Sequence, residues 1–233
     1  MSRKSFSHVK SLCGENRLQF KKEPMLLDSD LSQLVLVDYQ ARLMPKIFEH
    51  EEILRNAELL GIVARGLEIP VWGTEQNPQG LGQNVEAIRQ LCLETMSKRH
   101  FSAVAEGLTA RLRPEVDEAP PPARQGGNAR SLPKHLQSRA PQLTAETERN
   151  MIVIAGCEAH VCLLQTALDL IDEEFEVWVV TDACSSRTER NRDAAFDRLA
   201  TAGVDLVTTE MVVFEWMRTS EHVAFRDILP LIK

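Results

Sequence analysis

Apolar residues in this chain follow two patterns: short continuous runs, and longer segments with apolar side chains at every third or fourth position. The runs predict strands that are buried on both faces of a parallel sheet, and the longer spacing predicts amphipathic helices. Strands are expected at 34–37, 70–72, 151–155, 176–180 and 204–207, with extended structure also at 95–101. Helices are expected at 51–65, 85–93, 103–112, 159–171 and 188–202 and near the C-terminus. This alternation predicts an α/β fold with three layers, α/β/α, around a mostly parallel central sheet.

Two segments fall outside the alternating pattern. Residues 1–24 are rich in Ser, Lys and Arg without periodicity, so we expect a flexible N-terminal arm, with a mitochondrial presequence as the alternative. Six of the eleven prolines lie between Pro114 and Pro141, which predicts a Pro-rich insertion at about 114–145, either disordered or a lid. Residues 25–233 are expected to form one domain, because 233 residues with 43% hydrophobic content can bury one large core.

Charge and cysteine content narrow the functional classes. A formal net charge of −7 argues against a general nucleic-acid-binding protein, and no apolar run reaches membrane-spanning length. The five scattered cysteines, without a secretory signal, predict reduced thiols in a cytoplasmic protein, and none has the CxxC spacing of a zinc site. We therefore expect a small-molecule substrate as the partner, and neither nucleic acid nor a membrane.

The turn between the strand at 151–155 and the following helix carries the first candidate for chemistry. Gly156 ends the strand, and Cys162 is expected in or next to the first turn of the helix. Unpaired backbone N–H groups and the helix dipole favour negative charge there, so we expect the pKa of the Cys162 thiol to be lowered. The alternative is that Cys162 is one more small buried apolar residue.

Two more candidates follow other strands. Asp38 comes directly after the apolar run at 34–37, where a carboxylate is either exposed, an N-cap, or held by a cation or hydrogen-bond donors. Lys98 lies within the extended segment at 95–101, and a lysine on its buried side would require an acidic partner. A polar, glycine-rich loop at 73–82 is expected at the carboxyl end of another strand, where open α/β sheets bind ligands.

Four motifs in this order carry a family likeness: LVLVDYQ at 34–40, TEQNPQGLG at 74–82, KRHFSA at 98–103 and GCEAHVC at 156–162. The chain resembles the isochorismatase-like cysteine hydrolases, and within them the isochorismatase-domain-containing subgroup. That resemblance agrees with the predicted α/β/α fold, which is Rossmann-like. By motif position, it implies a catalytic triad of Asp38 as base and proton carrier, Lys98 as fixed positive charge and Cys162 as nucleophile.

The resemblance also implies how the acyl group is held. A covalent Cys162 intermediate would be released by water, and the backbone N–H groups of Glu158 and Cys162 would form the oxyanion hole. A cis peptide bond is implied between Cys157 and Glu158, with Cys157 in a structural role. Weaker candidates for substrate binding are Tyr39, Gln76 and His160.

Two departures from relatives limit the reaction. Nicotinamidases of this superfamily carry an Asp and His cluster for a metal after the second strand, whereas this chain has Glu75, Gln76 and Asn77 there and no His-x-His pattern. Isochorismatases that cleave a vinyl ether lack the nucleophilic cysteine. We therefore expect hydrolysis of a small amide or related C–N compound, with no metal and no cofactor.

Other interpretations stay open at this stage. The chain could be a catalytically silent protein that acts as a binding or interaction module, while a nuclease has little support because of the acidic charge. Relatives commonly assemble, so a homo-oligomer is expected. The apolar stretch at 211–217 belongs either to the core or to an interface, and the core is the first choice for such a stretch.

Overall fold

The computed structural model describes residues 25–114 and 149–232. The predicted arm at 1–24 lies outside these ranges, as does the predicted insertion at about 114–145 except for Pro114. Neither prediction is tested by the structure.

A six-stranded sheet forms the centre of the molecule, and all of its strand pairs are parallel. Its spatial order is β3-β2-β1-β4-β5-β6. The strands are β1 (Ser32–Val37), β2 (Val71–Gln76), β3 (Glu94–Lys98), β4 (Met151–Gly156), β5 (Glu176–Val180) and β6 (Asp205–Val207). The predicted α/β class with a parallel sheet is confirmed.

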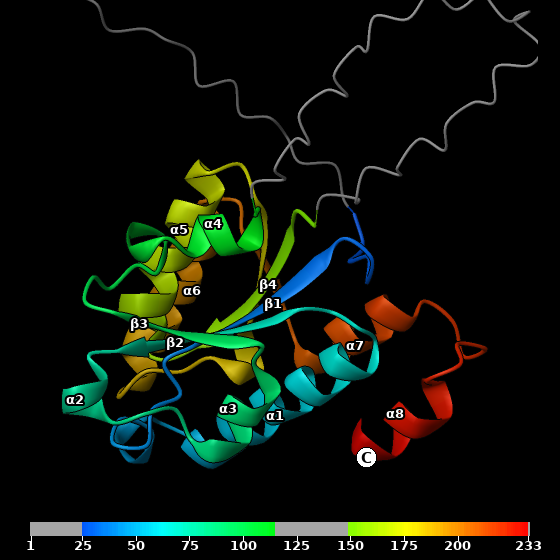
Figure 1. Cartoon of the computed structure of the whole chain (residues 1–233), viewed down its shortest axis with the longest axis horizontal. Helices are drawn as coiled ribbons and strands as arrows, with labels where there is room; N and C mark the ends of the chain where they lie inside the picture. Colours follow the sequence, from blue (N-terminus) through cyan, green and yellow to red (C-terminus); the bar gives the residue numbers. More distant parts are fainter. Residues whose placement is uncertain (1–24, 115–148, 233) are drawn as a thin grey trace, which may run out of the picture.

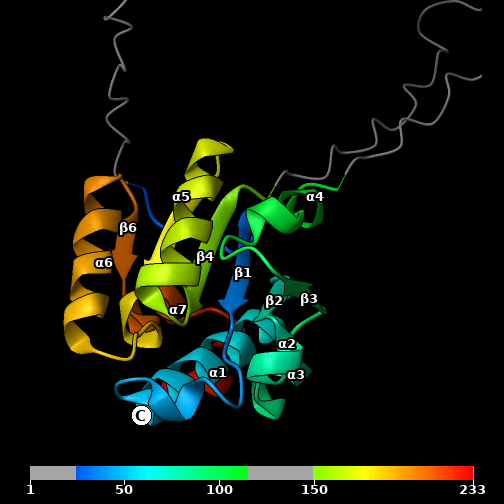
Figure 2. The same cartoon turned by 90° about the vertical axis from the view of Figure 1, so that its left-hand side faces the viewer.

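Helices cover both faces of this sheet, which gives the three predicted layers (Figures 1 and 2). One face carries α1 (His50–Gly66), α3 (Glu86–Leu91), α7 (Thr209–Met217) and α8 (Phe225–Ile232). The other face carries α4 (Leu108–Leu112), α5 (Leu164–Asp172) and α6 (Glu189–Thr201). A short helix, α2 (Pro78–Leu81), follows β2. The inner strands β1, β4 and β5 are almost completely buried between the two layers, which explains why they read as continuous apolar runs.

Four elements differ from their predicted form. The extended structure expected at 95–101 ends at Lys98, the last residue of β3. The loop expected at 73–82 begins later, because β2 continues through Thr74, Glu75 and Gln76. The helix expected at 103–112 is two short pieces, a 3-10 turn at Val104–Glu106 and then α4. The helix expected from residue 159 begins with a π-helical turn, Ala159–Leu163, before it becomes α5.

The apolar stretch at 211–217 lies mainly in the core, as α7. Val212, Val213, Trp216 and Met217 are buried, whereas Met211 and Phe214 are exposed. The choice of core over interface is therefore confirmed for most of this stretch.

The chain reverses its direction of growth across the sheet between β1 and β4, and their carboxyl ends lie side by side at that point. The strands approach closely there, because Val37 pairs with Gly156. A Cβ atom on Gly156 would lie 2.3 Å from the carbonyl oxygen of Val37, and the φ angle of Gly156 is 156°. Ligands of open α/β sheets bind at such switch points, so the sheet topology directs attention to the residues after β1 and β4.

The side chain of Gln33 binds both segments that flank residues 115–148. Its Nε2 donates 2.9 Å hydrogen bonds to the carbonyl oxygens of Leu112 and Arg149. Its Oε1 accepts a 2.9 Å bond from the indole N–H of Trp72, so the amide is fixed from both sides. Leu112 and Arg149 are therefore held together beside β1.

Candidate active site

Asp38 follows β1 directly and lies completely buried at the switch point. Its backbone is in the left-handed region with φ 55°, and its N–H donates to the carbonyl oxygen of Thr74. Its Oδ1 accepts a 2.7 Å bond from the Thr74 hydroxyl. Aspartate tolerates this backbone conformation better than most residues, so the turn can present the carboxylate at the strand end.

Lys98, the last residue of β3, completes an ion pair with Asp38. Its Nζ lies 2.8 Å from Asp38 Oδ2, and both side chains have no exposed surface. The ammonium donates two further bonds, to Gln76 Oε1 at 2.8 Å and to the carbonyl oxygen of Phe101 at 3.0 Å. The three N–H bonds of the ammonium thus have three acceptors, which offsets the cost of burying the charge.

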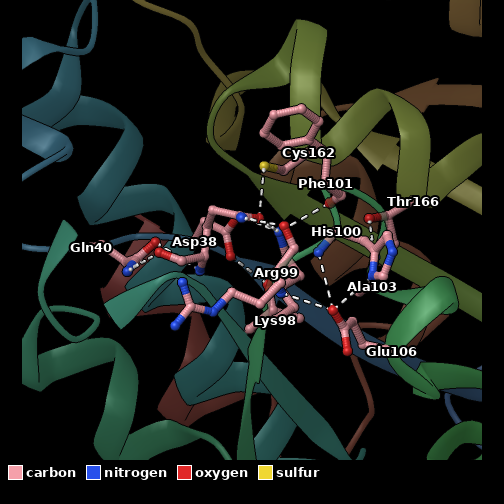
Figure 3. A network of polar contacts seen from close by, with 12 residues as sticks. Asp38, Gln40, Lys98, Arg99, His100, Phe101, Ala103, Glu106, Cys162 and Thr166 are labelled. Atoms are coloured by element: carbon pink, nitrogen blue, oxygen red, sulfur yellow. Dashed lines mark hydrogen bonds and ion pairs between the residues drawn. The ribbon is translucent and has the colours of Figure 1, made fainter. Parts of the chain in front are cut away.

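Gln76 links this pair to the cysteine. Figure 3 shows Asp38, Lys98 and Cys162 within the surrounding polar network. Its Oε1, which accepts from Lys98, also lies 4.0 Å from the Sγ of Cys162. Its Nε2 donates to the carbonyl oxygen of Arg99 at 2.8 Å, so the orientation of the amide is fixed. The structure therefore brings Asp38, Lys98, Cys162 and Gln76 together.

Two polar residues complete this arrangement, and neither was predicted as a site residue. Thr74 bonds Asp38, and Gln40 pairs through its side-chain amide with the backbone N–H and carbonyl oxygen of Gln76. Both are completely buried. The sequence contained an indication for each residue, because both lie inside the motifs at the strand ends. A polar side chain buried there lowers stability unless it forms hydrogen bonds.

Cys162 lies in the π-helical turn that follows β4, and its side chain is only 6% exposed. The peptide bond between Cys157 and Glu158 is cis, as the resemblance implied. The next N–H, of Ala159, donates to the carbonyl oxygen of Ser185. Within the described parts of the chain the Glu158 N–H has no hydrogen-bond acceptor, so this group is free to bind a ligand oxygen.

The expected lowering of the thiol pKa is wrong. The pKa of Cys162 is raised to about 12, first by burial and then by the Asp38 carboxylate, while Lys98 lowers it in part. The local effect of a helix start is outweighed by desolvation, which the sequence pattern around the cysteine does not report. Cys162 is therefore a protonated thiol, and a base would have to remove its proton before the sulfur could act as a nucleophile.

Cys157 is completely buried, and burial raises the pKa of its thiol to about 12. No side of it is open to solvent, in agreement with the structural position expected for it. Together with Cys92 and Cys184 it is a free thiol, as is Cys162. The fifth cysteine, Cys13, lies outside the described residues.

The weaker candidates Tyr39 and His160 are occupied elsewhere. The hydroxyl of Tyr39, a completely buried residue, donates to the carbonyl oxygen of Ala183 at 2.6 Å. The ring nitrogens of His160 lie 2.9 Å from Ser186 Oγ and 3.4 Å from Asn191 Nδ2. Substrate binding by Tyr39 or His160 gains no support from these positions and stays a prediction.

Charged residues around this centre are paired. The side chain of Glu158 accepts from the backbone N–H and Nε of Arg187 at 3.1 and 2.9 Å. In the loop after β3, Glu106 accepts from the backbone N–H groups of Arg99 and His100. These hydrogen bonds, that of His100 first, lower the pKa of Glu106 to about 2. The carboxylate therefore closes the loop that supplies the Phe101 carbonyl to Lys98.

Other binding features lie away from the cysteine or are missing in the described chain. A surface cavity of about 400 Å³ is lined by Leu26, Met211, Phe214 and neighbouring residues, none of which is at the carboxyl ends of β1, β3 and β4. Among residues 25–114 and 149–232, no three His, Cys, Asp or Glu side chains group so as to hold a metal ion. No helix in these ranges has the length and apolar character needed to cross a membrane.

Structural comparison finds the same fold in solved proteins. MAR1 ribonuclease from Caenorhabditis elegans superimposes with a TM-score of 0.72 at 27% identity, covering 89% of this chain and 92% of that one. YcaC from Pseudomonas aeruginosa, solved with hexane-2,5-diol and covalent acrylamide, has a TM-score of 0.68 at 23% identity and coverage of 88% and 91%. YcaC from Escherichia coli, described as an octameric hydrolase of unknown specificity, has a TM-score of 0.67 at 23% identity and coverage of 91% and 96%.

Sequence comparison identifies the family. Isochorismatase domain-containing protein 2B from Mus musculus is 35% identical over 202 residues, which cover 87% of this chain and 81% of that protein. The human isochorismatase domain-containing protein 2 is also 35% identical over 202 residues, with coverage of 87% and 83%. The family model of the Isochorismatase domain matches residues 32–211. The predicted resemblance is confirmed: the chain belongs to the isochorismatase-domain family.

Proposed function

We propose that this protein is a cysteine-dependent hydrolase that cleaves the C–N bond of a small amide or related compound through a covalent intermediate on Cys162. The observation that carries the proposal is the buried Asp38–Lys98 pair, whose lysine shares the Gln76 oxygen with the Cys162 sulfur. An acid, a cation and a thiol placed together at the carboxyl ends of three strands are the parts that acyl transfer needs.

The first half of the reaction forms a thioester. Asp38 accepts the thiol proton while the Cys162 sulfur bonds to the acyl carbon and the carbonyl electron pair moves onto oxygen. The free backbone N–H of Glu158, with that of Cys162, binds this oxyanion. The C–N bond then breaks, and the leaving nitrogen takes the proton back from Asp38.

The second half releases the acid. Asp38 accepts a proton from water, the hydroxide adds to the thioester carbon, and the C–S bond breaks as the sulfur regains the proton. Lys98 holds the carboxylate in place. Its positive charge keeps the site neutral when the sulfur is negative and the proton is on Asp38. Because the resting thiol has a raised pKa, proton transfer to Asp38 accompanies attack on a bound substrate and does not precede it.

Covalent trapping tests the proposal. The protein is incubated with a panel of small primary amides, and the peptide that contains Cys162 is examined by mass spectrometry for an acyl adduct. Acrylamide serves as a separate probe of thiol reactivity, because it adds a thiol across its C=C bond and keeps its amide nitrogen; the YcaC structure from Pseudomonas aeruginosa holds acrylamide covalently within the same fold. Persistent absence of turnover and of Cys162 adducts would favour the silent binding module.

Two substitutions distinguish nucleophile from structural thiol. Cys162→Ala should abolish turnover, by about a thousandfold or more, with the fold intact, because only the reacting atom is removed. Cys157→Ala should keep measurable activity, since its sulfur faces the core. Equal losses from the two changes would contradict the assignment.

RNA cleavage is the second candidate, because the Caenorhabditis elegans structure is named a ribonuclease. The net charge of −7 and the burial of Lys98 leave the proposed site poorly suited to a phosphate backbone. Incubation of labelled RNA with wild type and with Cys162→Ala decides: cleavage by wild type that is lost in the variant would replace the amidase proposal. A cytoplasmic homo-oligomer is part of our proposal, and the oligomeric state is measurable by light scattering.

A further inference from the structure

The charges at the candidate site cancel, and each charged group already has its partner. Asp38 and Lys98 contribute one negative and one positive charge, both on side chains without exposed surface. The third polar group, the amide of Gln76, is neutral and fixed through Arg99 and Lys98. The buried surroundings of Cys162 therefore have a net charge of zero when the sulfur is protonated.

Lys98 has no N–H left for a substrate anion. Its three donors go to Asp38 Oδ2, Gln76 Oε1 and the Phe101 carbonyl oxygen, at 2.8, 2.8 and 3.0 Å. An anionic substrate group could bind this ammonium only by displacing one of these acceptors. Displacement of the Asp38 carboxylate would leave a second unpaired charge in the core.

Cations and anions on the neighbouring loops are also engaged. The Arg99 guanidinium donates to Asn77 Oδ1 at 3.0 Å, and the His100 ring lies 2.8 Å from Glu106 Oε1. The Glu158 carboxylate is bound to Arg187. Each of these charged groups has a hydrogen-bond partner, which is a charged side chain for His100 and Glu158 and the neutral amide of Asn77 for Arg99.

The raised pKa of the Cys162 thiol also indicates that additional negative charge is unfavourable at this site. Burial raises the pKa of Cys162 to about 12, which means that one additional negative charge is disfavoured there even with Lys98 nearby. An added carboxylate or phosphate would meet the same penalty, whereas a neutral amide can be buried at the cost of its own hydrogen bonds only.

We infer that the substrate class is restricted to small uncharged acyl compounds, and that a carboxylate or phosphate next to the scissile bond is excluded by the closed charge balance of Asp38, Lys98 and Gln76. The inference rests on the proposed function and narrows it. Simple aliphatic amides and ureas fit this class, whereas amide-bearing dicarboxylates and nucleotides do not.

Two alkylating reagents of matched size test the inference without any knowledge of the substrate. Iodoacetamide is neutral and iodoacetate is anionic, and both form a C–S bond with the thiolate as iodide leaves. Their rate ratio at Cys162, read from the alkylated peptide, does not depend on the fraction of thiolate, because both reagents attack the same species. The reference is the ratio for a small neutral thiol, N-acetylcysteine amide, in the same buffer. We expect the preference for iodoacetamide to be at least about tenfold larger at Cys162 than for this reference thiol.

Two charge-changing variants separate electrostatics from shape. Asp38→Asn leaves a net positive site and should shift the ratio toward iodoacetate, whereas Lys98→Met leaves a net negative site and should shift it further toward iodoacetamide. Both replacements keep the approximate size of the side chain. If Lys98→Met does not fold, Asp38→Asn, which retains the lysine, decides on its own.

The outcomes are distinct. A ratio at Cys162 equal to that of the reference thiol overturns the inference, and so does a large ratio that neither variant moves, because the exclusion would then be steric. Opposite shifts in the two variants support it. The hydrolase proposal is judged separately by turnover of an unsubstituted primary amide, so a failure of catalysis leaves the reagent ratio readable. A wild-type protein that hydrolyses an amide with an adjacent carboxylate as fast as its neutral counterpart would refute the substrate restriction alone.

Discussion

Loss of the Lys98 charge alone should destabilise the protein more than loss of both charges of the buried ion pair. Lys98→Met leaves the Asp38 carboxylate in the core with the Thr74 hydroxyl as its remaining side-chain donor. Breaking a buried pair in this way costs about 3–5 kcal/mol of unfolding free energy. Asp38→Asn should cost less, because the amide oxygen can still accept from Lys98, which also keeps its two neutral acceptors.

The double variant, which combines Asp38→Asn with Lys98→Met, gives the magnitude of the coupling. Neither charge is buried in it, so the double loss should fall short of the sum of the single losses by about 2–3 kcal/mol. Urea unfolding measures these values: with a slope of about 2–3 kcal/mol per molar, a loss of 3–5 kcal/mol lowers the midpoint by about 1–2.5 M.

A matched control is available at the surface. Arg111 and Glu94 also approach to 2.8 Å, but their side chains are 34% and 49% exposed. The same cycle there should give about 0.2–1 kcal/mol. If the losses at Asp38 and Lys98 add within about 0.5 kcal/mol, the pair is not energetically coupled, and the reasoning from burial is refuted.

Lys98, Gly156 and Glu106 each give a further prediction. Because Lys98 lowers the pKa of the Cys162 thiol against the effect of burial, Lys98→Met should raise that pKa. The pH profile of iodoacetamide alkylation at Cys162 should then move to higher pH. Superimposable profiles of wild type and variant would remove the lysine from the site. Gly156→Ala should lower the free energy of unfolding by about 3 kcal/mol, since the new Cβ would lie 2.3 Å from the neighbouring strand. The control Gly66→Ala, with no atom within 4 Å of the new Cβ, should leave this free energy unchanged. Similar urea midpoints for the two variants would contradict the close approach. The pKa of Glu106 is lowered from 4.5 to about 2, so the stabilising effect of its carboxylate is complete above pH 4.5 and is lost as the pH falls toward 2. Glu106→Gln should therefore lower the melting temperature at pH 7, and the two melting temperatures should converge near pH 2. A difference that stays constant with pH would argue against a role of the carboxylate.

Strand ends were the part of the site that could be predicted from the sequence. Apolar runs mark where parallel strands stop, and the carboxyl ends of such strands share one edge of the sheet. Asp38, Lys98 and the Cys162 turn were therefore expected in one place, and the structure brings them together. The family resemblance assigned them roles that the spacing alone left open.

Contacts that depend on strand register were not predictable in the same way. Thr74 reaches Asp38 because β1 and β2 pair Val37 with Thr74, a register that no local pattern specifies. The polar end of β2 looked like a loop, since Gln76 satisfies its hydrogen bonds with distant partners. The raised pKa of Cys162 has the same origin, because the burial comes from the tertiary structure and not from the residues around the cysteine.

The amide of Gln33 has a consequence for how the protein can be shortened. Because one nitrogen binds the carbonyl oxygens of Leu112 and Arg149, these two carbonyl groups lie within two hydrogen-bond lengths of each other. The entropy of closing a loop between fixed ends grows only with the logarithm of its length, about 0.6 kcal/mol for each doubling. A short Gly-Ser connection between Pro114 and Arg149 should therefore join these two points at little entropic cost, and it should leave the sheet unaltered.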